Sequence, residues 1–82
     1  MKILITGAAG FIGFNFSKYL LKNSNFKIVG IDNLDNYYSI GIKKQRLKCL
    51  KPYKNFSFQK IDIRNKKNLD KLIKKNNFSL IF

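Results

Sequence analysis

Apolar residues recur along this chain in two alternating patterns, short continuous runs and stripes with helical spacing. The runs are bounded by turn residues or acids, as is typical of buried strands, and they cover 2–6, 26–31, 56–61 and 78–82. The stripes predict helices that begin at Phe11 and end near Asn23, and that cover 40–50 and 65–76. Because strands alternate with helices, the pattern predicts βαβ units and a parallel sheet.

The order β-α-β-α-β-α-β predicts an α/β fold, the N-terminal part of a Rossmann-type doubly wound parallel sheet with right-handed crossovers. The last strand, 78–82, should lie beside the first strand, at the edge of the sheet, with unpaired backbone groups. No internal repeat or low-complexity linker divides the chain. We therefore expect one structural unit over residues 1–82.

The helical stripes also predict which side chains are buried. The residues expected on the sheet-facing side are Phe16, Tyr19 and Leu20 in the first helix and Ile40, Leu47 and Leu50 in the second. We expect Lys43, Lys44 and Arg46 to form a solvated helix face rather than a phosphate clamp. Cys49 is expected to be a partly buried small side chain and not a nucleophile.

Composition excludes several kinds of chemistry. The 82 residues contain no histidine and one cysteine, so Cys/His zinc sites, histidine acid–base catalysis and an internal disulfide are excluded. A single thiol suits a reducing compartment, and we expect a cytoplasmic protein. The apolar stretch 3–14 is interrupted by glycines and is shorter than the roughly 20 residues that span a bilayer, so no membrane partner is expected.

The chain is strongly basic, with 17 Lys plus Arg against 4 Asp plus Glu and a formal net charge of +13. Lysine far outnumbers arginine, and Lys, Asn, Ile, Phe and Tyr are all abundant, as A/T-rich codons would produce. Nucleic-acid binders concentrate basic residues, including arginine, in one stripe, whereas these are spread along the chain. We expect solvated lysines and no nucleic-acid partner; a small basic nucleic-acid-binding module is the alternative.

The segment 7–13, GAAGFIG, places glycines at a G-x-x-G-x-x-G spacing between the first strand and the first helix. Glycine there lets the chain reverse tightly, lets the backbone approach a pyrophosphate, and lets the helix pack closely on the strand. The helix N-terminus directs free N–H groups and its dipole at the phosphates. No Gly-Lys-Ser/Thr follows, which excludes a P-loop. An ordinary glycine-rich turn would also explain the glycines alone.

Asp32 closes the second apolar run, 19 residues beyond Gly13. This is close to the roughly 20-residue spacing of the acid that binds the ribose of a dinucleotide. An Asp that initiates a turn in Asp-Asn is the other explanation. The turn and the acid together in one βαβ unit favour dinucleotide binding, and an acid with no arginine after it favours NAD over NADP.

The GAAGFIG spacing resembles the extended short-chain dehydrogenases/reductases, the NAD-dependent sugar-nucleotide epimerases and dehydratases. The segment 30–38, GIDNLDNYY, with the basic helix after it, resembles the UDP-glucuronate 4-epimerase subgroup. This resemblance covers essentially all 82 residues. It implies NAD as cofactor, a nucleotide sugar as substrate, a homodimer, and 4-epimerisation of a UDP-sugar such as UDP-glucuronate by transient hydride transfer to NAD. A 4,6-dehydratase of the same family is the alternative.

The resemblance also implies roles for individual residues. Those implied in cofactor binding are Gly7, Gly10, Phe11, Ile12, Gly13, Asp32, Asn33, Asn36, Asp62 and Ile63. The first five would form the pyrophosphate-binding turn, the next three would surround the adenosine ribose, and the last two would contact adenine. Asp62 also suits a polar strand end beside a helix start. Tyr37 and Tyr38 fit either a cofactor contact or a turn with two packed aromatics.

The family's catalytic Tyr-x-x-x-Lys pair has no counterpart in the chain. None of its four tyrosines is followed by lysine four residues later, so we predict no catalytic residue. We expect residues 1–82 to be the N-terminal portion of the NAD-binding domain of a longer enzyme, without its catalytic and substrate-binding parts and inactive alone.

Overall fold

A computed structural model describes residues 1–34 and 40–82 of the protein. The elements occur in the predicted order, and their bounds lie within two residues of those expected from the sequence. They are β1 (Lys2–Thr6), α1 (Phe11–Asn23), β2 (Lys27–Asp32), α2 (Ile40–Leu50), β3 (Phe56–Lys60), α3 (Lys66–Lys75) and β4 (Leu80–Ile81). Asn36, Tyr37 and Tyr38 lie outside the described residues.

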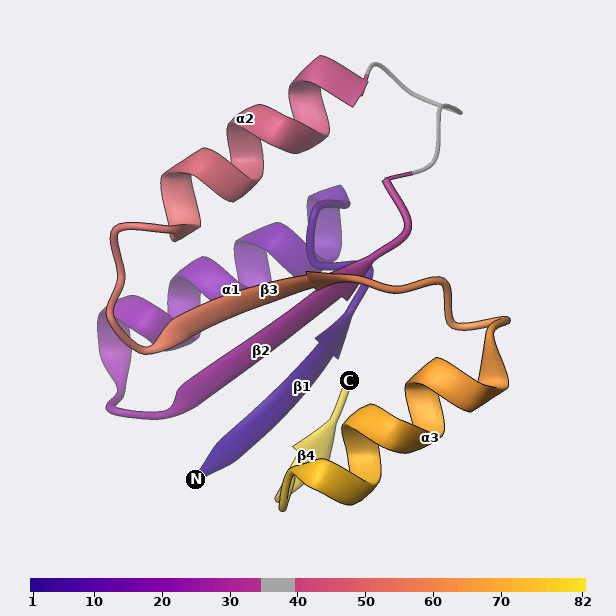
Figure 1. Cartoon of the computed structure of the whole chain (residues 1–82). Helices are drawn as coiled ribbons and strands as arrows, with labels where there is room; N and C mark the ends of the chain where they lie inside the picture. The colour runs from indigo at the N-terminus through magenta and orange to yellow at the C-terminus, as the bar shows by residue number, and fades with distance from the viewer. Residues whose placement is uncertain (35–39) are drawn as a thin grey trace.

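The four strands form one parallel sheet in the order β3-β2-β1-β4 (Figure 1). β1 and β2 pair in register from Lys2 opposite Lys27 to Thr6 opposite Ile31. β4 pairs with β1 through Leu80 and Ile81 and lies at the edge, as predicted. Because all strands are parallel, their carboxyl ends meet at one end of the sheet.

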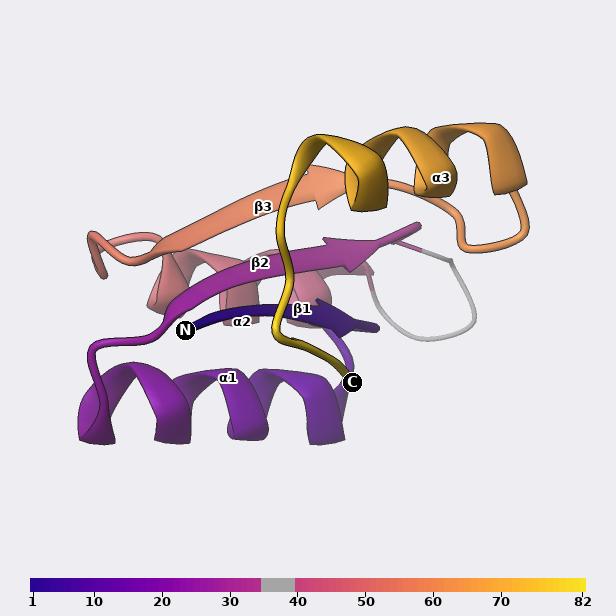
Figure 2. The same cartoon turned by 90° about the horizontal axis from the view of Figure 1, so that it is seen from below.

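The helices cover both faces of the sheet, with α1 and α2 on one side and α3 on the other (Figure 2). Alternate residues of β1 therefore enter two separate cores. Ile3 and Ile5 pack with residues under α1 and α2, and Leu4 packs with Leu72 of α3. Burial on both faces explains why β1 is a continuous apolar run.

The predicted burial of the helices is partly wrong. Gly13, Ser17 and Leu21 form the buried face of α1. Since a helix turns about 100° per residue, Tyr19 lies roughly 200° from Ser17 and is exposed, while Phe16 and Leu20 flank the core. In α2, Leu47 and Leu50 are buried as expected. The exposed residues of α2 include Ile40 and Cys49, contrary to expectation.

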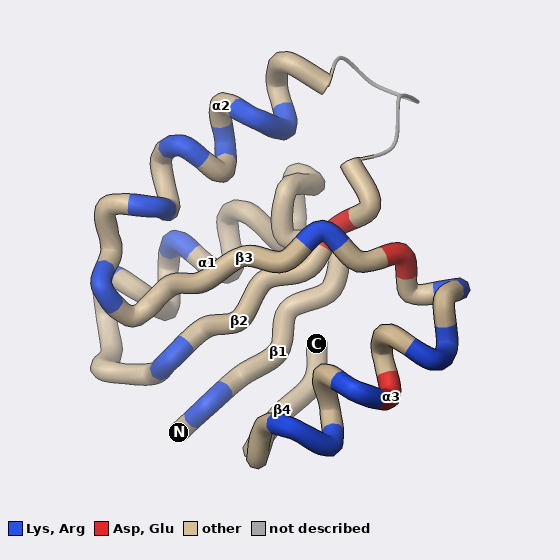
Figure 3. Tube along the Cα trace, in the orientation of Figure 1, with Lys and Arg blue, Asp and Glu red and all other residues tan. Residues whose placement is uncertain are grey.

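Charged residues are distributed unevenly by sign (Figure 3). Lysines and arginines occur on all three helices and on several strands. Of the three described acids, Asp32 and Asp62 lie at or just after the carboxyl ends of β2 and β3, and Asp70 lies on α3. Within residues 1–34 and 40–82, no helix is both long and apolar enough to cross a membrane.

Candidate cofactor-binding site

The turn between β1 and α1 requires glycine at two positions. Gly7 has a φ of +65°, in the left-handed region that side chains rarely adopt. A Cβ on Gly13, in the first turn of α1, would lie 2.2 Å from the carbonyl oxygen of Gly7, so a larger residue would force the start of α1 away from the turn that follows β1. The predicted need for glycine in a tight reversal is therefore confirmed, and Gly13 lets α1 lie close to the backbone of that reversal.

The N-terminus of α1 faces a broad hollow. Gly10 precedes the helix and has no side chain to cap it, and the first N–H groups of any helix have no partner within that helix. The hollow has a volume of about 490 Å³. Its lining consists of Thr6, Gly7, Gly10, Phe11, Ile12, Gly13 and Phe82. Backbone donors and the positive end of a helix dipole suit an anion at this place.

Asp32 at the end of β2 is tied to the turn. Its side chain is buried, and one carboxylate oxygen accepts a hydrogen bond from the N–H of Ala9 at 3.0 Å. The other oxygen accepts from the N–H of Leu34 at 2.8 Å and lies 3.5 Å from the Lys43 Nζ. A carboxylate offers about four acceptor positions, so these three donors leave capacity for a ligand hydroxyl.

A second hollow, of about 240 Å³, lies beside Asp32. Its lining consists of Thr6, Gly7, Ile31, Asp32, Asn33, Ile61 and Ile63. It shares Thr6 and Gly7 with the hollow at α1, so the two are adjacent along the carboxyl ends of the strands. This is where ligands bind in open α/β sheets. Every predicted site residue among those described borders one of the two hollows except Asp62.

Asp62 follows β3, and its carboxylate is paired with the side chain of Arg64. The Arg64 guanidinium donates to both carboxylate oxygens, with Nη2 to Oδ2 at 2.7 Å, and the Arg64 N–H donates to Oδ1 at 2.9 Å. These bonds, with a smaller contribution from the Asn33 side chain, lower the pKa of Asp62 from 3.8 to about 2. The carboxylate is thus ionised and partly exposed at the rim, beside Ile63.

The prediction that Lys43, Lys44 and Arg46 form a solvated face is wrong for two of the three. Lys43 is buried against Asp32, and Arg46 donates from Nη1 to the carbonyl of Ala9 at 3.0 Å. Only Lys44 is exposed. The sequence contains a signal for this burial. Lys43 is four residues from Leu47 and three from Arg46, so helical spacing places Lys43 and Arg46 on the apolar side of α2.

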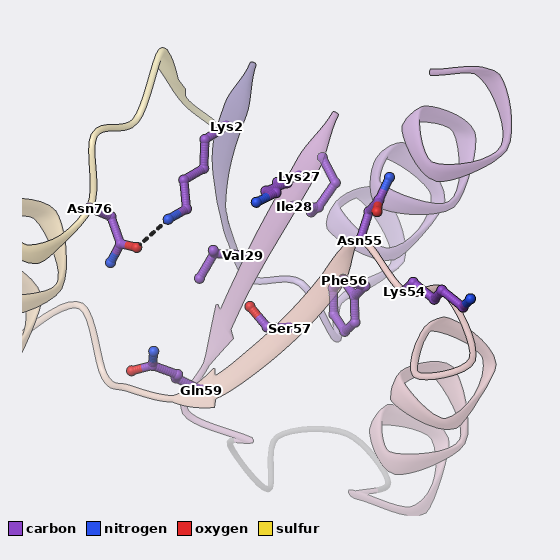
Figure 4. Close-up of a pocket in the computed structure, with 10 residues that line it drawn as sticks. All are labelled: Lys2, Lys27, Ile28, Val29, Lys54, Asn55, Phe56, Ser57, Gln59 and Asn76. Atoms are coloured by element: carbon purple, nitrogen blue, oxygen red, sulfur yellow. Dashed lines mark hydrogen bonds between the residues drawn. The ribbon is translucent and has the colours of Figure 1, made fainter. Parts of the chain in front are cut away.

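Another groove lies toward the amino ends of the strands (Figure 4). It has a volume of about 280 Å³. Its lining consists of Lys2, Lys27, Ile28, Val29, Lys54, Asn55, Phe56, Ser57, Gln59 and Asn76. Lys2 Nζ donates to the Asn76 side-chain oxygen at 2.6 Å across it. This groove is remote from the glycine turn and has none of the predicted site residues.

Comparison with known proteins gives consistent matches along the chain. The family model described as GDP-mannose 4,6 dehydratase matches residues 4–82. A UDP-glucuronate 4-epimerase of Thermodesulfobacterium geofontis is 45% identical over 62 residues, which are 76% of this chain and 19% of that protein. The chain spans about a quarter of the length of the curated relatives that match it over nearly its whole length.

Solved structures match the fold as well. The UDP-glucuronic acid 4-epimerase of Bacillus cereus, in complex with UDP-glucuronic acid and NAD, is 38% identical with a TM-score of 0.86, over 100% of this chain and 25% of that one. The dTDP-glucose 4,6-dehydratase of Bacillus anthracis, in complex with NAD, is 34% identical with a TM-score of 0.83, over 99% and 25%. The chain therefore belongs to the epimerase/dehydratase family of the extended short-chain dehydrogenases/reductases.

Proposed function

We propose that residues 1–82 are the N-terminal portion of an NAD-binding domain and hold the adenosine and pyrophosphate side of NAD. One observation carries this proposal: the buried Asp32 carboxylate is hydrogen-bonded to the glycine turn at Ala9, beside two adjacent hollows. The acid that would bind the ribose and the turn that would bind the phosphates are thereby held together at the carboxyl ends of the strands.

Each part of the site has a distinct role in this proposal. The N–H groups of Phe11 and Ile12 would donate to the pyrophosphate at the α1 N-terminus, where Gly10 leaves the approach open. Asp32 would accept from the ribose hydroxyls, with Asn33 beside it. Ile63, and Asp62 at the rim, would contact adenine. Bound NAD would supply a hydride acceptor, and these residues would fix its adenosine half.

For the whole protein we propose 4-epimerisation of a UDP-sugar such as UDP-glucuronate. The support is the 45% identity to a UDP-glucuronate 4-epimerase and the TM-score of 0.86 to a UDP-glucuronic acid 4-epimerase. A 4,6-dehydratase reaction is the second candidate, supported by the matching family model and by the NAD-bound dehydratase structure. In either case residues outside 1–82 would perform the chemistry, and we expect the whole protein to be a homodimer.

Calorimetric titration of the full-length protein tests the cofactor. We expect saturable binding of NAD, weaker binding of NADP, and at most a DNA interaction that collapses when salt is raised, because that attraction would be charge alone. Salt-resistant DNA binding without NAD binding would overturn the proposal and favour the nucleic-acid alternative.

Product analysis tests the reaction. Incubation of the full-length protein with UDP-glucuronate should give its C4 epimer, detected by NMR. Conversion of GDP-mannose or dTDP-glucose to a keto sugar, with UDP-glucuronate unchanged, would instead assign the dehydratase reaction.

A further inference from the structure

Arg46 connects α2 to the glycine turn between β1 and α1. Its Nη1 donates to the carbonyl oxygen of Ala9 at 3.0 Å, and its guanidinium carbon lies 5.9 Å from the centre of the Phe11 ring. Ala9 is fully buried, and its N–H donates to Asp32. Both backbone groups of Ala9 are therefore held by side chains, one from β2 and one from α2.

These contacts fix two successive peptide planes of the turn. The carbonyl of Ala9 and the N–H of Gly10 belong to one planar peptide unit. Arg46 holds the carbonyl of that unit, and the Gly10 N–H donates to the Gly7 carbonyl at 2.9 Å. Asp32 holds the N–H of the preceding unit. The chain thus enters α1 with a defined orientation of the backbone immediately before Phe11 and Ile12.

Such anchoring matters because glycine has more backbone freedom than any other residue. A turn with glycine at positions 7 and 10 would lose that freedom when it binds a ligand, and ordering it beforehand improves affinity. A hydrogen bond from a charged guanidinium is also stronger than one between neutral groups.

We propose that Arg46 is a positioning residue for the pyrophosphate-binding turn: it orders the Ala9–Gly10 peptide and so aligns the N–H groups that follow. This inference rests on the proposed NAD site. It requires no contact between Arg46 and the cofactor, and it assigns to Arg46 an effect on the pyrophosphate that is separate from the binding of adenosine at Asp32.

The test uses three variants of the full-length protein. Arg46→Met removes the donors and keeps most of the stem, Arg46→Lys keeps the charge but not the planar fork, and Lys44→Met removes an exposed charge from the same helix as the control. NADH binding is measured by fluorescence, with ADP and adenosine as competitors. ADP carries the pyrophosphate that the turn would bind, and adenosine lacks it.

We expect Arg46→Met to weaken NADH and ADP binding about tenfold, or ~1.4 kcal/mol, while adenosine changes less than about twofold. Arg46→Lys should show a smaller loss with the same selectivity, and Lys44→Met should resemble the wild type. Unchanged ADP binding, or equal losses for ADP and adenosine, would overturn the inference.

Should circular dichroism show Arg46→Met to be unfolded, Arg46→Lys decides by the same comparison of ADP with adenosine. Failure of the wild type to bind NADH would instead refute the proposed NAD site, so the two failures are distinguishable.

Discussion

At the scale of single residues, Asp32 makes the contacts that hold the candidate site together. Its carboxylate receives the Ala9 and Leu34 N–H groups and the Lys43 ammonium. The sequence shows no arginine directly after Asp32, but the fold supplies Lys43 as a cation 11 residues later. Lys43 compensates part of the charge that would repel the 2′-phosphate of NADP, so we expect the preference for NAD to depend strongly on Asp32 as a hydroxyl acceptor.

Asp32→Ala should therefore weaken NAD binding by about 1.5–3 kcal/mol, since it removes a charged hydrogen-bond acceptor. NADP binding should fall less, because the remaining Lys43 attracts the 2′-phosphate. Calorimetric titration of both cofactors measures the change in preference. Asp70→Ala removes an exposed acid from α3 and is the control. If the Asp32→Ala variant had the same ratio of NAD affinity to NADP affinity as the wild type, Asp32 would not contact the ribose.

Gly10 and Gly13 should respond differently to substitution. Gly13→Ala places a Cβ 2.2 Å from the Gly7 carbonyl oxygen and should destabilise the protein by about 1–3 kcal/mol, as overpacking does. At Gly10 the same distance is 3.2 Å, so Gly10→Val should fold and mainly obstruct the pyrophosphate. Denaturant unfolding and NAD titration separate the two effects. Normal NAD affinity in folded Gly10→Val would exclude the turn as a cofactor contact.

The Asp62–Arg64 pair predicts that the stability of the folded protein depends on pH in the acid range. Because the folded pKa of Asp62 is lowered from 3.8 to about 2 by Arg64, its contribution to stability is present above pH 4 and is lost as the pH falls toward 2. Arg64→Gln should return the pKa toward 3.8, which carboxyl NMR titration measures. A wild-type pKa already near 3.8 would show that the pair does not form in solution.

At the scale of elements, the alternating pattern predicted every strand and helix of the described chain, because the period of each apolar run or stripe matches the strand or helix that it forms. Periodicity alone misplaced Tyr19, since small residues at Gly13 and Ser17 determine which face of α1 approaches the sheet. The roles of Lys43 and Arg46 depend on how α2 docks beside the turn. Contacts between residues 37 positions apart, such as Ala9 and Arg46, have no local signal in the sequence.

β4 carries a prediction about the 82-residue chain expressed alone. It pairs only with β1 among the described strands, and Leu80, Ile81 and Phe82 are each about half exposed. An apolar edge strand promotes association, so we expect a broad thermal transition and aggregation that Ile81→Lys reduces. Circular dichroism and sedimentation measure both properties. A sharp two-state melt of a wild-type monomer would contradict this expectation.

At the scale of the whole molecule, the two ends of the sheet differ in chemistry. The carboxyl ends carry the glycine turn and Asp32 beside two adjacent hollows, whereas the groove toward the amino ends is lined by Lys2, Lys27 and Lys54. The basic charge of the chain is distributed over all three helices (Figure 3). We therefore propose that the cofactor binds at the carboxyl ends of the strands and that the lysine-lined groove takes no part in binding it.

NMR titration of the isotope-labelled full-length protein with NAD tests this placement most directly. We predict saturable shifts of the amide resonances of Phe11, Ile12 and Gly13, together with those of Asp32 and Asn33, while resonances around the Lys2–Lys27–Lys54 groove stay in place. Saturable shifts confined to that groove, or none at the glycine turn, would contradict the account.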